Sequence, residues 1–127
     1  MPLKPIILDT NFLLVPFQFK INILAEIDYL VEIGHYYLIS SNTLNELERL
    51  SKKIGKHGAS ARLALKLIAA NDIKIIESNR HVDDWITDYA KENNAIVCTN
   101  DGKLRRKLKK MNIKVITLKS KSKIGFI

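Results

Sequence analysis

The chain has 127 residues, and its shares of 46% hydrophobic and 27% charged residues are those of one globular domain. They exclude a disordered chain, and the single cysteine, Cys98, excludes a disulfide framework and a cysteine-based zinc site. No apolar run reaches the roughly 18 residues of a membrane helix, and Asp9 ends the first apolar stretch too early for a signal peptide. We therefore expect a cytoplasmic protein with no membrane contact.

The charge balance favours a polyanionic partner. Lys and Arg number 21 against 13 Asp and Glu, which leaves a net charge of +8. A small basic domain of this kind commonly binds nucleic acid. Most of the excess is lysine, however, so the composition of the host or a hot habitat is an alternative explanation.

Apolar strand-like segments alternate with segments that carry apolar residues at helical spacing. In chain order, we predict a strand at 4–8, a helix at 19–33, a strand at 36–40, a helix from Asn42 or Thr43 to 54, a basic break at 55–58, a helix at 59–70, a strand at 73–76, a helix at 82–92, a strand at 95–98, a helix at 103–111 and a strand at 114–118. This alternation predicts an α/β fold with helices on both faces of a parallel sheet. Residues 1–118 form the predicted domain, and residues 119–127 a basic tail.

Two acidic residues follow predicted strands at their carboxyl ends, where the functional groups of parallel sheets gather. Asp9 follows the first strand, and Asp101 follows the strand at 95–98. Helix capping is the alternative for both residues, because Asp is favoured at a helix N-cap and in turns.

Helical periodicity favours Asp83 over Asp84 as a functional acid. Asp83 lies at the border of an apolar stripe that includes Trp85 and Tyr89, whereas Asp84 lies opposite that stripe. The alternative is that both acids only stabilise the positive end of the helix dipole.

The helix after Ser40 carries two further acids, Glu46 and Glu48, which flank its apolar face on opposite borders. Periodicity does not choose between them, and an exposed helix with a Glu48–Lys52 pair is the alternative. Together, the acids predict three or four carboxylates at one end of the sheet. Such oxygen ligands suit Mg²⁺ or Mn²⁺. An acidic pocket in a basic protein is typical of a metal-dependent nuclease.

Four short motifs resemble those of the PIN-domain ribonucleases. They are Leu8-Asp9-Thr10-Asn11, Thr43-Leu44-Asn45-Glu46-Leu47, Asp83-Asp84-Trp85-Ile86 and Val97-Cys98-Thr99-Asn100-Asp101. The resemblance runs from residue 6 to residue 118 and implies a three-layer α/β/α fold with a five-stranded parallel sheet in the order 3-2-1-4-5. It implies an Mg²⁺- or Mn²⁺-dependent endoribonuclease. Its catalytic, metal-binding acids would be Asp9, Glu46, Asp83 and Asp101.

The resemblance also assigns supporting polar roles to Asn11, Ser40 and Thr99. Basic residues expected beside the acids would bind RNA, and they are Lys52, Lys53, Lys103, Arg105 and Arg106. A solvated helix face is the alternative for any one of these basic residues.

Within the family, residues 46–50 and the basic tail look closer to the ribosome-assembly branch. The resemblance therefore favours ribosomal RNA processing beside ribosome-assembly proteins. Two alternatives stay open: a toxin ribonuclease restrained by an antitoxin, and a non-catalytic RNA-binding scaffold in ribosome assembly. Family members often dimerise, so a homodimer is a further expectation.

Overall fold

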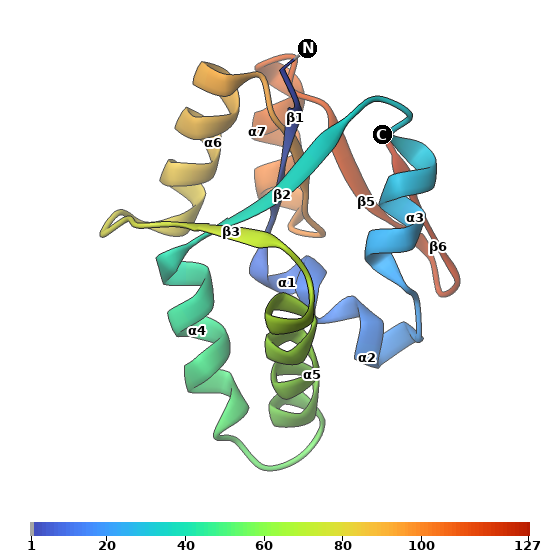
Figure 1. Cartoon of the computed structure of the whole chain (residues 1–127), viewed down its shortest axis with the longest axis vertical. Coiled ribbons are helices and arrows are strands. Elements are labelled where there is room, and N and C mark those ends of the chain that lie inside the picture. Colours follow the sequence, from blue (N-terminus) through green and yellow to red (C-terminus); the bar gives the residue numbers. More distant parts are fainter. Residues whose placement is uncertain (1) are drawn as a thin grey trace.

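The apolar segments of the chain form the strands of one central sheet. In the computed structural model, which describes residues 2–127, the strands are β1 (Lys4–Leu8), β2 (His35–Ser40), β3 (Ile73–Ile76), β4 (Ile96–Cys98), β5 (Val115–Ser120) and β6 (Lys123–Phe126). Their order is β3-β2-β1-β4-β5-β6 (Figure 1). The first five strands are parallel and in the predicted order, and β6 runs antiparallel to β5.

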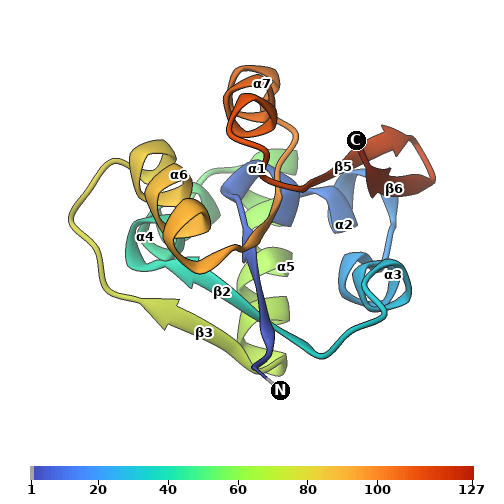
Figure 2. The same cartoon turned by 90° about the horizontal axis from the view of Figure 1, so that it is seen from above.

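Helices cover both faces of this sheet, as the alternating pattern predicts. They are α1 (Thr10–Leu13), α2 (Val15–Phe19), α3 (Ile23–Leu30), α4 (Ser41–Ser51), α5 (Lys56–Ala70), α6 (Val82–Asn93) and α7 (Gly102–Lys110). Successive side chains of a strand point to opposite faces. Ile6 and Leu8 accordingly pack in the core beneath α3 and α5, whereas Ile7 packs in a second core beneath α6 and α7 (Figure 2). The predicted three-layer α/β/α fold is thus confirmed.

The prediction of a basic tail is wrong. Residues 119–127 complete β5 and form β6, so the sheet has six strands rather than five. Ile124 is only 2% exposed and packs in the larger core. The lysines of this segment are exposed, as is common on an edge strand, where charge discourages pairing with another chain. The lysines of this segment led to the prediction of a tail, although apolar residues lie between them in the sequence.

The predicted helix at 19–33 is also too long. Two short helices, α1 and α2, precede it, and Lys20 ends α2 in a left-handed conformation with φ of 55°. The helix itself begins at Ile23, where the Asn22 side chain accepts a hydrogen bond from the Ala25 N–H at 3.3 Å.

The predicted break at 55–58 is shorter as well, because α5 already begins at Lys56.

The helices α4 and α5 pack against each other and extend beyond the carboxyl edge of the sheet (Figure 1). This hairpin builds one wall above the edge where β1 and β4 end. Within residues 2–127, no helix is both long enough and apolar enough to cross a bilayer.

Candidate functional site

The candidate site lies where the strand order reverses direction. After β1 the chain crosses to β2 on one side, and after β4 it crosses to β5 on the other side. The two strands are direct neighbours, and the Asp9 N–H continues their pairing by donating to the Cys98 carbonyl at 3.0 Å. A crevice at such a switch point is the usual ligand site of an open parallel sheet.

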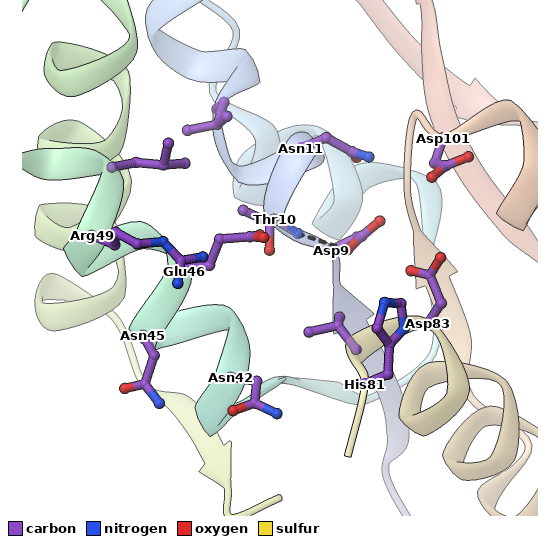
Figure 3. A pocket seen from close by; sticks show the side chains of 13 residues that line it. Asp9, Thr10, Asn11, Asn42, Asn45, Glu46, Arg49, His81, Asp83 and Asp101 are labelled. Carbon is purple, nitrogen blue, oxygen red and sulfur yellow. Dashed lines mark hydrogen bonds between the residues drawn. The ribbon is translucent and has the colours of Figure 1, made fainter. Parts of the chain in front are cut away.

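A pocket of about 680 Å³ opens at this point. All four sequence-predicted acids line it, and each comes from a different segment (Figure 3). Asp9 follows β1, Glu46 lies on α4, Asp83 lies in the first turn of α6 and Asp101 precedes α7. The structure therefore brings together four acids that are separated by up to 92 positions in the sequence.

The structure also separates the acids that the sequence left as alternatives. Glu46 and Asp83 are partly buried and line the pocket. Glu48 and Asp84 are exposed, and neither belongs to the pocket lining. The helical projection that favoured Asp83 thus predicted its orientation correctly.

Asp9 is the most buried of the four acids, with 6% of its surface exposed. Its Oδ1 accepts a hydrogen bond from the Thr10 N–H at 2.9 Å and so caps α1. Its Oδ2 accepts from the Thr99 hydroxyl at 2.7 Å. Both carboxylate oxygens are therefore held in fixed directions.

Asp101 also combines capping with a place in the pocket. Its Oδ1 accepts from the N–H groups of Lys103 and Leu104, at 2.9 and 3.2 Å, and so caps α7. Its own N–H donates to the Thr99 hydroxyl oxygen at 3.1 Å. Thr99 thus joins Asp9 to Asp101 through one buried hydroxyl. The capping interpretation from sequence is correct for both residues, and it does not compete with the interpretation as a site.

Asn11 holds the loop that leads to Asp101. Its Oδ1 accepts from the Asn100 N–H at 3.0 Å, and it lines the pocket. The Asn100 side chain in turn accepts from the Leu118 N–H at 2.9 Å and from the Thr117 hydroxyl at 3.1 Å. These bonds tie the loop after β4 to both α1 and β5.

Ser40 does not line the pocket. It is buried and caps α4, because its hydroxyl oxygen accepts from the Thr43 N–H at 3.1 Å. Since Glu46 lies less than two turns further along this helix, Ser40 contributes by fixing where α4 begins.

Burial sets the electrostatics of the pocket. It raises the pKa of Asp9 from its ordinary value of 3.8 to about 6, with a smaller contribution from the charges of Asp83 and Asp101. The hydrogen bonds from Thr99 and Thr10 act in the opposite direction but do not outweigh burial. The pocket therefore holds excess negative charge in a partly desolvated place, which a bound cation would relieve.

The five basic residues expected beside the acids lie outside the pocket lining. Lys52 and Lys53 lie at the end of α4, and Lys103, Arg105 and Arg106 lie on α7. Arg105 donates to the Thr117 hydroxyl at 3.2 Å, so it also links α7 to β5. RNA contact by these five residues stays a prediction.

Five further polar residues line the pocket, and the sequence analysis gave none of them a role in the site: Thr10, Asn42, Asn45, Arg49 and His81. Three of them follow one another on α4 at spacings of three and four residues, and Arg49 lies one turn after Glu46 (Figure 3). That spacing places side chains on one face of a helix. The spacing of Arg49 from Glu46 could therefore have identified Arg49 as a pocket residue from the sequence alone.

The donor set of the pocket fits a hard divalent cation. Carboxylate oxygens are the preferred ligands of Mg²⁺ and Mn²⁺, and the Oδ2 of Asp101 accepts no hydrogen bond from any part of the described chain. Within residues 2–127, no three His, Cys, Asp or Glu side chains are drawn together closely enough to hold an ion between them. A cation bound in the pocket would offset the repulsion between these like charges.

Comparisons with known proteins agree with this architecture. The chain is 39% identical to ribonuclease VapC4 of Methanocaldococcus jannaschii over 121 residues, which cover 91% of each chain. It is 31% identical to ribonuclease VapC9 of Archaeoglobus fulgidus, over 93% of this chain and 85% of the relative.

Among solved structures, the PIN-domain endonuclease Utp24 has the same fold, with a TM-score of 0.79 and 24% identity over 96% of this chain and 90% of that one. The family description "PIN like domain" matches residues 6–121. With the strand order and the four acids in place, the chain belongs to the PIN-like domain family.

Proposed function

We propose that this protein is a divalent-metal-dependent endoribonuclease. One observation carries the proposal: four carboxylates from four separate segments line one pocket at the switch point of the sheet, and the most buried of them has a raised pKa. Structural acids on a protein surface seldom converge in this way, because their mutual repulsion costs stability. A site that binds a cation offsets that cost.

Asp9, Glu46, Asp83 and Asp101 would hold the metal, with Mg²⁺ or Mn²⁺ as the ions that suit them. A divalent ion bound there would polarise a phosphodiester oxygen and supply hydroxide at neutral pH. Thr99 keeps Asp9 and Asp101 in register, since its hydroxyl donates to one and accepts from the N–H of the other. Asn11 holds the intervening loop in place.

RNA is the proposed substrate because both sequence relatives are ribonucleases. The test is cleavage of a labelled, partly single-stranded RNA by purified protein in Mn²⁺, Mg²⁺ or EDTA. We expect cleavage in the metal ions and none in EDTA. Asp101→Asn should lose cleavage, and so should Asp83→Asn and Glu46→Gln.

Two neighbouring acids provide matched controls. Asp84→Asn and Glu48→Gln remove the same charges from the same two helices but lie outside the pocket lining, so we expect them to cleave like the parent protein. Equal cleavage by Asp83→Asn and Asp84→Asn would refute the assignment of the site. RNA binding without cleavage in either metal would instead support the scaffold alternative.

A toxin ribonuclease restrained by an antitoxin is the second candidate, because both sequence relatives are VapC ribonucleases. Ribosomal RNA processing rests on the short motif at residues 46–50, since the likeness to Utp24 supports the fold alone. Induced expression in a host cell separates the two. Growth arrest that Asp101→Asn abolishes supports the toxin, and normal growth supports a processing enzyme.

A further inference from the structure

We propose that a groove between α2 and α5 binds the single-stranded RNA segment next to the cleavage site, with a nucleobase stacked on Phe17. This inference rests on the proposed function and extends it to a second binding site. The groove has a volume of about 800 Å³, and its lining includes Phe17, Leu63, Lys20, Lys56 and His57. It is separate from the acidic pocket.

The floor of the groove presents apolar side chains to solvent. Phe17 and Leu63 are both 39% exposed and line the same groove, whereas an apolar side chain that is exposed singly is ordinary on a protein surface. Phe17 lies on α2, and Leu63 lies on α5, the helix that packs against α2 (Figure 1). An exposed aromatic ring in a groove can stack on any base, because every base has a flat π-face.

The rim of the groove carries charge of one sign. Lys20 and Lys56 are exposed there beside the neutral-counted His57, and no acidic residue is part of the lining. Lys52 and Lys53 lie just before Lys56, in the turn between α4 and α5. Aromatic side chains beside a basic track are the usual combination for binding a single strand. A basic protein partner would be repelled by these lysines, and a neutral one would leave their charges without a counter-charge.

The groove and the acidic pocket are separate but lie near each other along the chain. Leu14 lines the pocket, and Pro16, two residues later, lines the groove. Arg49 lies on the α4 wall of the pocket and takes part in neither of the two ion pairs found within residues 2–127. The linings of the pocket and of the groove therefore come within two residues of each other along the chain, at Leu14 and Pro16. This proximity favours the substrate itself as the occupant.

The experiment uses the full chain with Asp101→Asn, which prevents cleavage, and a fluorescein-labelled single-stranded RNA whose binding is followed by anisotropy over a range of salt concentrations. Phe17→Leu keeps an apolar side chain but removes the ring. It should weaken binding about tenfold, within the range measured for the loss of one stacked base. It should leave the salt dependence unchanged, because no charge is lost.

Lys56→Gln should give the complementary result. Removing one phosphate contact lowers the slope of log affinity against log salt by about 0.7 for a single strand. Lys91→Gln is the matched control, because Lys91 is exposed in the last turn of α6 and lines neither the groove nor the acidic pocket. It should preserve both the affinity and the slope.

A spectroscopic signal reports the stacking itself. In Phe17→Trp, the new indole is exposed while the chain's own Trp85 is only 7% exposed, so RNA should quench the added fluorescence. Parent-like binding by Phe17→Leu and Lys56→Gln, without quenching in Phe17→Trp, would overturn the proposal even while the wild type cleaves RNA. Quenching by polyglutamate but not by RNA would overturn it as well, in favour of an acidic protein segment. If the wild type neither binds nor cleaves RNA, the proposed function itself fails.

Discussion

The raised pKa of Asp9 predicts that this residue destabilises the metal-free fold at neutral pH. Its carboxyl group is buried beside two further acids, which raises the pKa from 3.8 to about 6. The folded state therefore holds the proton more tightly than the unfolded chain does. By linkage, the free energy of unfolding falls as the pH rises from about 4 to about 6 and then levels off.

The size of the effect follows from the two pKa values. A difference of this size corresponds to about 3 kcal/mol of lost stability above pH 6. Asp9→Asn should recover most of it, because an amide oxygen can still accept the capping bond from the Thr10 N–H. The amide N–H₂ can donate to the Thr99 hydroxyl oxygen in place of the bond that Asp9 accepts. For a chain of this length, the gain corresponds to a rise in Tm of roughly 10 °C.

The assay is thermal unfolding of wild type and Asp9→Asn in EDTA, between pH 4 and pH 8. We expect nearly equal Tm values at pH 4 and a growing advantage for the variant up to about pH 6.5. Asp84→Asn, at an exposed position, should show no such trend. An Asp9→Asn variant that is less stable than the wild type by the same amount at every pH would refute the reasoning, because only its hydrogen bonds would then matter.

Adding the metal should remove the advantage. A ligand at 100 times its Kd stabilises the folded state by about 2.7 kcal/mol, which is close to the cost of the buried charge. Mn²⁺ at pH 7.5 should therefore raise the Tm of the wild type and leave that of Asp9→Asn almost unchanged. Equal shifts in both proteins would mean that Asp9 does not contribute to metal binding.

Three further predictions concern the scaffold. Gly58→Ala should cost about 2 kcal/mol or more in chemical denaturation, because the added Cβ would lie 1.8 Å from the Lys53 carbonyl oxygen. An unchanged midpoint would contradict the close approach of the turn between α4 and α5 to the first turn of α5. Ile124→Ala should cost about 2–4 kcal/mol in the same assay, whereas a true tail would tolerate the change. Partial burial by itself would raise the pKa of Asp28. The hydrogen bonds of its carboxylate with Tyr37 and His35 have the larger effect together, and the pKa is lowered from its ordinary value of 3.8. Asp28→Asn should therefore be less stable than the wild type at neutral pH, with a difference that shrinks as the pH falls through that lowered pKa.

Much of the fold could be predicted because its information is local. The five parallel strands are short apolar runs, and the helices α4 to α7 repeat apolar residues at helical spacing. The order of the strands came from the resemblance rather than from periodicity. The short helices α1 and α2 escaped prediction because four or five residues are too few to display a period. The strand β6 escaped because the lysines of an edge strand look like a solvated tail.

The site could be predicted only in part, for a related reason. Periodicity identified Asp83 because the border of an apolar stripe is a property of one helix. It did not separate Glu46 from Glu48, since the direction of the pocket depends on how α4 sits against α1 and β2. The groove that contains Phe17 lies between two helices that are some forty residues apart in the chain. The pattern of either helix alone therefore does not predict the groove.

Capping and the proposed metal binding at Asp101 use different oxygens of the same carboxylate. The two cap bonds from Lys103 and Leu104 both go to Oδ1, and this fixes the plane of the carboxylate. The remaining oxygen, Oδ2, is then held at a defined position beside the pocket without a partner of its own. In Asp101→Asn the amide oxygen can keep both cap bonds, so only the free carboxylate oxygen and its charge are lost. We therefore expect Asp101→Asn to fold normally, so that a loss of RNA cleavage in this variant would point to the carboxylate itself rather than to a disturbed fold.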